Sequence, residues 1–202
     1  HDAHAEEAGH EGHDHDDHAD EAGQEGHDHG AFDPHAWQSV TNVALYVGNI
    51  ERGLAAADPA GAETYAANAA TAQAQIAAMD GDIARQLAPL TQTFVTYHDA
   101  YGYFTDHYHL HSAGGLAAGD AAPPGAARLS ELRAQAEAGQ IACVFPEAQH
   151  DPALIANLAE GTALFIGAPL DPVGSTLDPS PQAYATLMTN LTKSLLTCAN
   201  KP

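Results

Sequence analysis

Apolar residues recur every three to four positions over 36–56, which predicts a helix with one buried face. The next helix is expected to begin at Asp58-Pro59, a capping carboxylate followed by proline at the first helical position. It is rich in alanine and continues over 60–87 until Pro89 ends it. At 1.5 Å per residue this helix reaches roughly 40 Å, longer than a small domain is wide. We therefore expect it to act as a rigid spine helix that connects parts of the molecule.

Beyond Pro89 the pattern changes to an alternation of strands and helices. Short β-branched, aromatic or continuously apolar runs predict strands at 93–97, 141–145 and 163–166, with a weaker candidate within 110–124. Helices are expected over 100–109, 126–138, 151–160 and 180–198. Alternation of this kind implies right-handed crossovers, and hence parallel strands covered by helices. The prediction is an α/β lobe with a parallel sheet of about four strands, preceded by the spine helix.

The first 30 residues differ in composition from the rest of the chain. They contain 11 of the 27 Asp and Glu and 8 of the 14 His, but none of the 6 Lys and Arg. With almost nothing apolar to bury, such a segment does not offset its ordering entropy, so we expect disorder without a ligand. We divide the chain into a disordered acidic His-rich loop (1–30), a helical segment that includes the spine helix (31–90) and a C-terminal α/β lobe (91–202).

Charge and hydropathy exclude two classes of partner. The net charge is −21, and neutralising phosphates requires clustered Lys and Arg, so nucleic-acid binding is excluded. An anionic membrane surface is disfavoured for the same reason. No run of about 18 apolar residues occurs, so we expect no direct membrane insertion.

Imidazoles interleaved with carboxylates suit Zn, Cu or Ni. In the His-rich loop their spacing is loose, which predicts several weak auxiliary sites instead of one tight site; an inert acidic tail is the alternative. The six residues that we assign to this auxiliary role are His10, His13, His15, His18, His27 and His29.

More specific candidates for metal ligands lie beside the predicted strands and helices. Ligands gather at the carboxyl ends of parallel strands, so His98, directly after the first predicted strand, is placed where a site forms. Asp171 and Glu147 follow two other strands in the same way, and His35 precedes the first helix. Each alone is more often an ordinary surface residue, but several together, in a chain with a His-rich loop, favour a metal site.

The remaining histidines of the lobe are not assigned to the metal site. His107, His109 and His111 fall at or after a short helix, and we interpret them as exposed residues, which is compatible with weak metal affinity at most. His150 precedes the capping Asp151, and we interpret it as part of the local structure there.

The chain has two cysteines, Cys143 and Cys198, and no CxxC motif. An even pair in an exported chain is compatible with one disulfide, and two separate buried thiols are the alternative.

Four segments, FDPHAW, YHDAYGYF, ARLSELRAQAEAGQIACVFPEAQ and LDPVG, follow one another in order behind the His-rich loop. Together they resemble the ZnuA-type zinc-uptake binding proteins of bacterial ABC transporters, and the resemblance covers essentially the whole chain. It implies a periplasmic solute-binding protein, not an enzyme, with two α/β lobes joined by one rigid helix. Such a protein holds a Zn²⁺ ion in the interlobe cleft and delivers it to a membrane permease.

The resemblance also implies roles for particular residues. His35 and His98 match the two histidines that bind zinc in that family. Asp171 matches a cleft aspartate that binds metal in manganese-type relatives and that water replaces in many zinc-type members. Cys143 and Cys198 match the family's disulfide between a strand of the C-terminal lobe and the last helix.

In one respect the chain departs from the family pattern. The family has an entire N-terminal lobe before the His-rich loop, and that lobe supplies another histidine ligand. This chain begins within the loop, so we expect it to be a C-terminal portion, half of a two-lobed fold that lacks the N-terminal lobe. Zinc sites take about four ligands, so the chain would hold only part of the site.

Two other functions are compatible with the same residues. A zinc-dependent hydrolase would use His35, His98 and Asp171 as ligands and Glu147 as base. Against it, the chain has no GxSxG, P-loop, dinucleotide fingerprint or HExxH motif. A metal-buffering module would use the His-rich loop alone.

Overall fold

The computed structural model describes residues 33–117, 119 and 124–200, so the predicted disordered loop over 1–30 lies outside the described residues. The described part begins with a 3-10 turn, η1 (Ala36–Gln38), and continues into α1 (Val40–Ala57). The sequence pattern predicts one helix over 36–56, but Ser39 divides it. The Ser39 backbone is extended and its hydroxyl accepts a hydrogen bond from the Asn42 N–H, which makes Ser39 the N-cap of α1.

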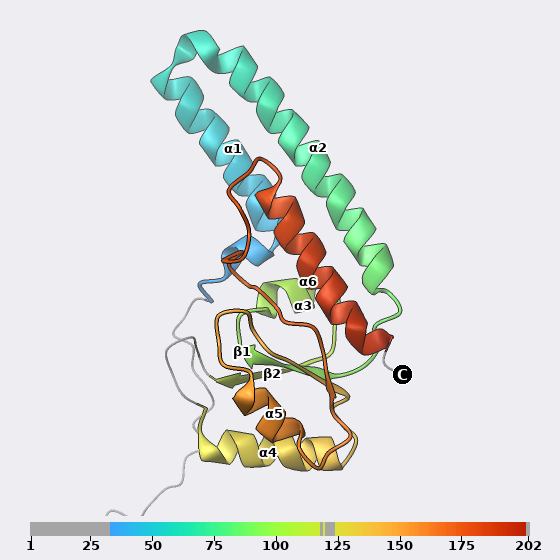
Figure 1. The fold of residues 1–202 in the computed structure, drawn as a ribbon. Helices are drawn as coiled ribbons and strands as arrows, with labels where there is room; N and C mark the ends of the chain where they lie inside the picture. Colours follow the sequence, from blue (N-terminus) through green and yellow to red (C-terminus); the bar gives the residue numbers. More distant parts are fainter. Residues whose placement is uncertain (1–32, 118, 120–123, 201–202) are drawn as a thin grey trace, which may run out of the picture.

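A second helix, α2 (Ala62–Leu87), packs along α1 to form a long hairpin that extends away from the rest of the molecule (Figure 1). A 3-10 turn, η2 (Pro59–Gly61), leads into it, with Pro59 at the predicted first position. The predicted capping role of Asp58 is wrong, because its carboxylate accepts a hydrogen bond from the Tyr65 hydroxyl at 2.9 Å and caps no helix N–H.

The rest of the chain forms a sheet of four parallel strands in the order β2-β1-β3-β4. The strands are β1 (Phe94–His98), β2 (Ser112–Ala117), β3 (Cys143–Phe145) and β4 (Phe165–Ile166). The helices are α3 (Gly102–His107), α4 (Ala126–Glu137), α5 (Ala153–Ala159) and α6 (Ala183–Ala199). The predicted α/β class with a parallel sheet of about four strands is confirmed, and the weak candidate within 110–124 is strand β2.

Alternate residues of the strands face two separate cores, one on each side of the sheet. Phe94 and Phe145 face a core built with α2, α3 and α6, whereas Val95 and Val144 face a core built with α4 and α5. Figure 1 shows this arrangement, with α4 and α5 on one side of the sheet and α6 on the other. Because both faces are covered, β3 and β4 lie in continuous apolar runs, IACVF and ALFI, the pattern from which they were predicted.

One disulfide joins the sheet to the last helix. Cys143 of β3 and Cys198 of α6 are bonded, with their Cα atoms 5.9 Å apart and 55 positions between them in sequence. Of the two alternatives for the cysteines, the disulfide is therefore the one observed. Closing a loop of this length stabilises the folded state by about 4 kcal/mol in the chain-entropy model.

Helix α1 differs from the other helices because it leaves large apolar side chains in solvent. Leu45 and Ile50 are 62% and 61% exposed, and Tyr46 and Leu54 of the same helix are also exposed. None of the described helices combines the length and apolar character that crossing a bilayer requires.

Candidate metal site

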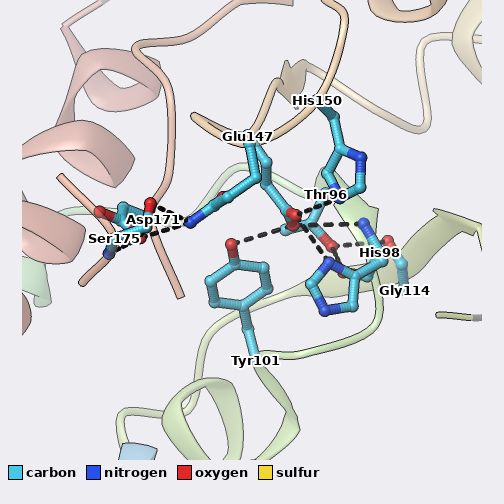
Figure 2. A network of polar contacts seen from close by, with 9 residues as sticks. Thr96, His98, Tyr101, Gly114, Glu147, His150, Asp171 and Ser175 are labelled. Carbon is cyan, nitrogen blue, oxygen red and sulfur yellow. Dashed lines mark hydrogen bonds and ion pairs between the residues drawn. The ribbon is translucent and has the colours of Figure 1, made fainter. Parts of the chain in front are cut away.

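The carboxyl ends of β1 and β3 meet at one edge of the sheet, where His98 and Glu147 lie in contact (Figure 2). His98 is the last residue of β1, and Glu147 follows β3 after Pro146. Nδ1 of His98 lies 2.7 Å from Oε2 of Glu147, and the His98 backbone N–H donates to Oε1 at 3.3 Å. The two side chains are 2% and 0% exposed. The structure thus brings together two of the residues that were predicted to lie at strand ends.

Two neighbours fix this pair in place. The Tyr101 hydroxyl, from the turn before α3, donates a hydrogen bond to Oε1 of Glu147 at 3.0 Å. On the other side, Gly115 of β2 lies so close to the end of β1 that an added Cβ would come within 2.6 Å of the His98 carbonyl carbon. A larger residue at position 115 would therefore displace His98.

His35 approaches the same edge from the turn before α1. Its ring centroid lies 5.4 Å from that of His98, with the two planes at 58°. Asp33 holds the ring, because Nδ1 of His35 lies 2.7 Å from Oδ1 of Asp33, which also accepts the His35 backbone N–H at 2.9 Å.

Trp37 anchors the turn that carries His35. Its indole N–H donates to the Pro172 carbonyl at 2.9 Å, and its own carbonyl accepts from the Tyr184 hydroxyl at 3.2 Å. The turn is therefore tied both to the loop after β4 and to α6, so the position of His35 depends on the folded lobe.

The two carboxylates also select which nitrogen of each ring can bind a metal. A neutral imidazole has one N–H and one lone pair. With Nδ1–H directed at Glu147 in His98 and at Asp33 in His35, the lone pair of each ring lies on Nε2. Carboxylate–histidine pairs of this kind orient metal-binding histidines and raise the basicity of the ligating nitrogen.

A third imidazole lies beside Glu147. His150 stacks on Tyr97, with centroids 4.0 Å apart and planes at 11°, and its Nε2 is 3.7 Å from Oε2 of Glu147. His98, Glu147 and His150 each offer a ligand atom within 4.8 Å of the others, and no other such group of three occurs within the part of the chain that the structure describes.

Asp171 has different partners. Its carboxylate accepts hydrogen bonds from the backbone N–H groups of Ser175 and Thr176, from both of their hydroxyls and from the Gln149 side chain. Burial would raise the pKa of Asp171, but these hydrogen bonds outweigh it and lower the pKa to about 2. In Figure 2 Asp171 lies with Ser175 on the far side of Glu147 from His98. The structure does not bring this predicted ligand into contact with His35 or His98.

The other predicted histidines lie apart from this edge. His109 and His111 are exposed, as expected. His107 is not fully exposed, because α3 packs near α2 and Nε2 of His107 pairs with Asp80 at 2.8 Å. The six auxiliary histidines of the His-rich loop lie outside the described residues.

Sequence reasoning missed three side chains at this edge, Asp33, Tyr101 and His150. Asp33 had a local signal, since it stands two residues before His35 in FDPHAW. The contact between Tyr101 and Glu147 joins residues 46 positions apart, so no local spacing indicates it. His150 was interpreted as local structure, but its ring turns back toward Glu147 and stacks on a residue of β1.

The matching family model and the most similar relatives give the same family. Residues 2–198 match the family model described as ZnuA, zinc-uptake complex component A, periplasmic. The chain is 45% identical over 168 residues to the high-affinity zinc uptake system protein ZnuA of Paracoccus denitrificans, a match that covers 82% of this chain and 51% of that protein. The same-named protein of Brucella suis is 34% identical over 173 residues, covering 85% and 52%. The chain therefore spans about half the length of these relatives.

Solved structures agree on the fold. A crystal structure of ZnuA is similar with a TM-score of 0.69 and 26% identity, covering 83% of this chain and 61% of that chain. The SBP FpvC of Pseudomonas aeruginosa in complex with Mn²⁺ has a TM-score of 0.71 at 20% identity, a likeness that concerns the fold alone. Both are larger than this chain, in agreement with the expectation that it corresponds to half of a two-lobed fold.

Proposed function

Because the chain belongs to the ZnuA family of periplasmic zinc-uptake components, we propose that it is part of a periplasmic solute-binding protein that captures Zn²⁺ and delivers it to an ABC permease. The cargo ion is held by Nε2 of His35 and Nε2 of His98. Further ligands come from an N-terminal lobe, from water or from Asp171.

The observation that carries this proposal is the spacing of the two imidazoles. Zn–N bonds of about 2.0–2.1 Å at a tetrahedral angle place the centroids of two bound imidazoles about 5 Å apart. The centroids of His35 and His98 are 5.4 Å apart, and each ring has a carboxylate on Nδ1. The donor set therefore fits a borderline divalent cation with little rearrangement.

The exposed face of α1 supports the proposed missing lobe. Single exposed apolar residues are ordinary, but Tyr46, Ile50 and Leu54 recur every four positions and so form an exposed stripe along one face of α1. The matched part of this chain covers only about half the length of these relatives, so a further lobe of such a protein is available to cover this face. We propose that it packs there and forms the second wall of the cleft.

Asp171 is a separate proposal from the two histidines. To bind the ion, its carboxylate must exchange hydrogen bonds from Gln149, Ser175 and Thr176 for a metal bond. If Asp171 keeps these hydrogen bonds, a water molecule completes the coordination of the ion instead. We propose that the loop around Asp171 positions Trp37, and through it His35, in either case.

The environment of Glu147 favours transport over the alternative of a zinc hydrolase. A general base must reach the water that it activates. Both oxygens of Glu147 are already engaged by His98 and Tyr101, and the side chain is fully buried. The named relatives are components of zinc uptake systems.

The test is zinc affinity, measured with the full chain by competition against a chromophoric chelator. His98→Ala removes a proposed ligand, and losing even an outer partner of a metal costs ~10–100-fold in affinity, so we expect at least that loss. His111→Ala, which removes an exposed imidazole elsewhere, serves as control and should leave the affinity unchanged. Equal affinities for wild type and His98→Ala would show that the ion binds elsewhere.

A deletion of residues 1–29 assigns the role of the His-rich loop. We propose that the loop supplies weak auxiliary zinc sites, so its removal should lower the number of weakly bound ions and leave the tight site in place. Loss of nearly all zinc binding would favour the metal-buffering alternative. Calorimetry of the two chains distinguishes these outcomes.

A further inference from the structure

The carboxylate of Glu147 lies next to two imidazoles. Oε2 is 2.7 Å from Nδ1 of His98 and 3.7 Å from Nε2 of His150 (Figure 2). The proposed capture of zinc by His35 and His98 uses the opposite nitrogen of His98 and leaves His150 without a role. Two imidazoles around one carboxylate are, however, themselves a set of zinc ligands.

The geometry of this set is close to that of a bound cation. Donor atoms of a tetrahedral zinc site lie about 3.3 Å apart, as follows from bond lengths of about 2.0–2.1 Å. Here the donor atoms all lie within 4.8 Å of one another, and Nδ1 of His98 is 2.7 Å from Oε2 of Glu147. A bound ion therefore requires this pair to open by about 0.6 Å, while His150 moves closer by up to about 1.5 Å. The His150 ring is held for this by its stacking on Tyr97.

Access distinguishes this set from the pair formed by His35 and His98. The His150 side chain is 18% exposed, whereas His98 and Glu147 are almost completely buried. A cation that arrives from solvent on this side therefore meets His150 first.

We propose that His98, Glu147 and His150 form a second cation position for zinc, which alternates with the position between His35 and His98. A neutral imidazole has a single lone pair. His98 binds an ion through Nδ1 in the position beside His150, or through Nε2 in the position beside His35, but not through both at once. Moving between them transfers the ring proton from one nitrogen to the other. The lobe thus has two overlapping positions that share one ring and hold one ion.

The test separates the two positions by removing the first. His35→Ala eliminates the position that the proposed function requires and leaves the second intact. We expect the full-length His35→Ala chain to retain one zinc ion in the lobe, and an anomalous-scattering map at the zinc edge to place it within bonding distance of His150 and Glu147. Adding His150→Phe, which keeps a flat ring against Tyr97 but removes both nitrogens, should weaken zinc binding by about tenfold or more.

The matched control is His35→Ala with His111→Phe, which removes an exposed imidazole and should bind zinc as His35→Ala does. Equal zinc affinity with and without His150→Phe, or a map on His35→Ala crystals with no zinc at His150, would overturn the second position. Failure of the proposed function has a different signature, because His35→Ala would then bind zinc as tightly as wild type. The map needs no His150 variant, so the proposal stays testable if His150→Phe misfolds.

Discussion

Glu147 and Asp171 are both carboxylates that follow strands of the same sheet, and they differ in what they hold. Glu147 accepts hydrogen bonds from His98 and Tyr101, whose contacts join residues 49 and 46 positions apart. Asp171 accepts from Ser175 and Thr176, four and five positions further along its own loop, and from Gln149. One carboxylate therefore orients a side chain of the site, whereas the other closes a loop.

An acid that follows a parallel strand therefore has no single role. Ligands do gather at that edge of a sheet. Whether a given acid takes part depends on which donors reach it first. At Asp171, backbone and hydroxyl donors of its loop are adjacent, and at Glu147 the closest donor is an imidazole from the neighbouring strand.

Among the variants that alter these two carboxylates and their partners, the largest effect is expected from Glu147→Gln. The variant keeps the shape of the side chain but removes the charge that orients His98 and raises the basicity of its Nε2. We expect zinc affinity to fall by ~10–100-fold, as for other outer partners of metal ligands. The free energy of unfolding should fall by about 1–3 kcal/mol, because a buried donor faces an amide N–H₂ group. Chelator competition and urea denaturation measure the two quantities.

Glu160→Gln is the matched control, since it neutralises an exposed acid at the end of α5. It should change neither quantity by more than about 0.5 kcal/mol. If Glu147→Gln bound zinc as well as this control does, Glu147 would have no more influence on the ion than a surface acid.

A smaller effect, mainly on stability, is expected from Asp171→Asn. The hydrogen bonds that lower the pKa of Asp171 from 3.8 to about 2 stabilise the folded state while the carboxylate is ionised. The variant should lose about 1 kcal/mol of unfolding free energy at pH 7, a modest value because solvent screens this partly exposed group. Chemical denaturation of both chains at a series of pH values measures it.

The pH dependence of that difference has a definite sign. A carboxylate whose pKa is lower in the folded state than in the unfolded state stabilises the fold. This stabilisation is complete at pH values above the unfolded-state pKa and is lost as the pH falls through the folded-state pKa. The difference in unfolding free energy between wild type and Asp171→Asn should therefore be constant above about pH 4 and decrease toward pH 2. Zinc affinity should change by about threefold or less if Asp171 only closes its loop. A loss as large as that of Glu147→Gln would instead make Asp171 a ligand.

The order of the elements could be predicted because their signals are local. Continuous apolar runs mark strands that are covered on both faces, and Val144 and Phe145 of the run IACVF indeed face opposite cores. Asp151 was predicted to cap a helix from the proline that follows it. The helix α5 begins at Ala153 with Pro152 as its N-cap, and the Asp151 carboxylate accepts the first helical N–H, that of Ala153, at 2.9 Å. At Asp58 the same dipeptide signal failed, because the Tyr65 hydroxyl competes for the carboxylate.

The candidate site could be predicted only in part, because a strand end indicates an edge of the sheet and not a partner. His98 was placed at that edge by the strand that precedes it. The position of His35 depends on the Trp37 indole reaching Pro172, a contact over 135 positions. The role of His150 depends on the chain turning back toward β1, so its ring lies on Tyr97. Contacts over such separations follow from the packed lobe and leave no local pattern.

The smallest effect is expected from Tyr101→Phe, which removes one donor to Glu147 and leaves the His98 contact in place. The buried carboxylate then loses a hydrogen bond, which costs about 1 kcal/mol of unfolding free energy. Zinc affinity should fall by about two- to fivefold, below the range for a direct partner of a ligand, because Tyr101 acts on His98 only through Glu147. Tyr103→Phe, which removes a hydroxyl from the adjacent helix α3, is the control. A tenfold loss of affinity in Tyr101→Phe alone would mean that the hydroxyl contacts the ion directly. Tyr101 would then be a ligand, and its effect on zinc would no longer depend on Glu147.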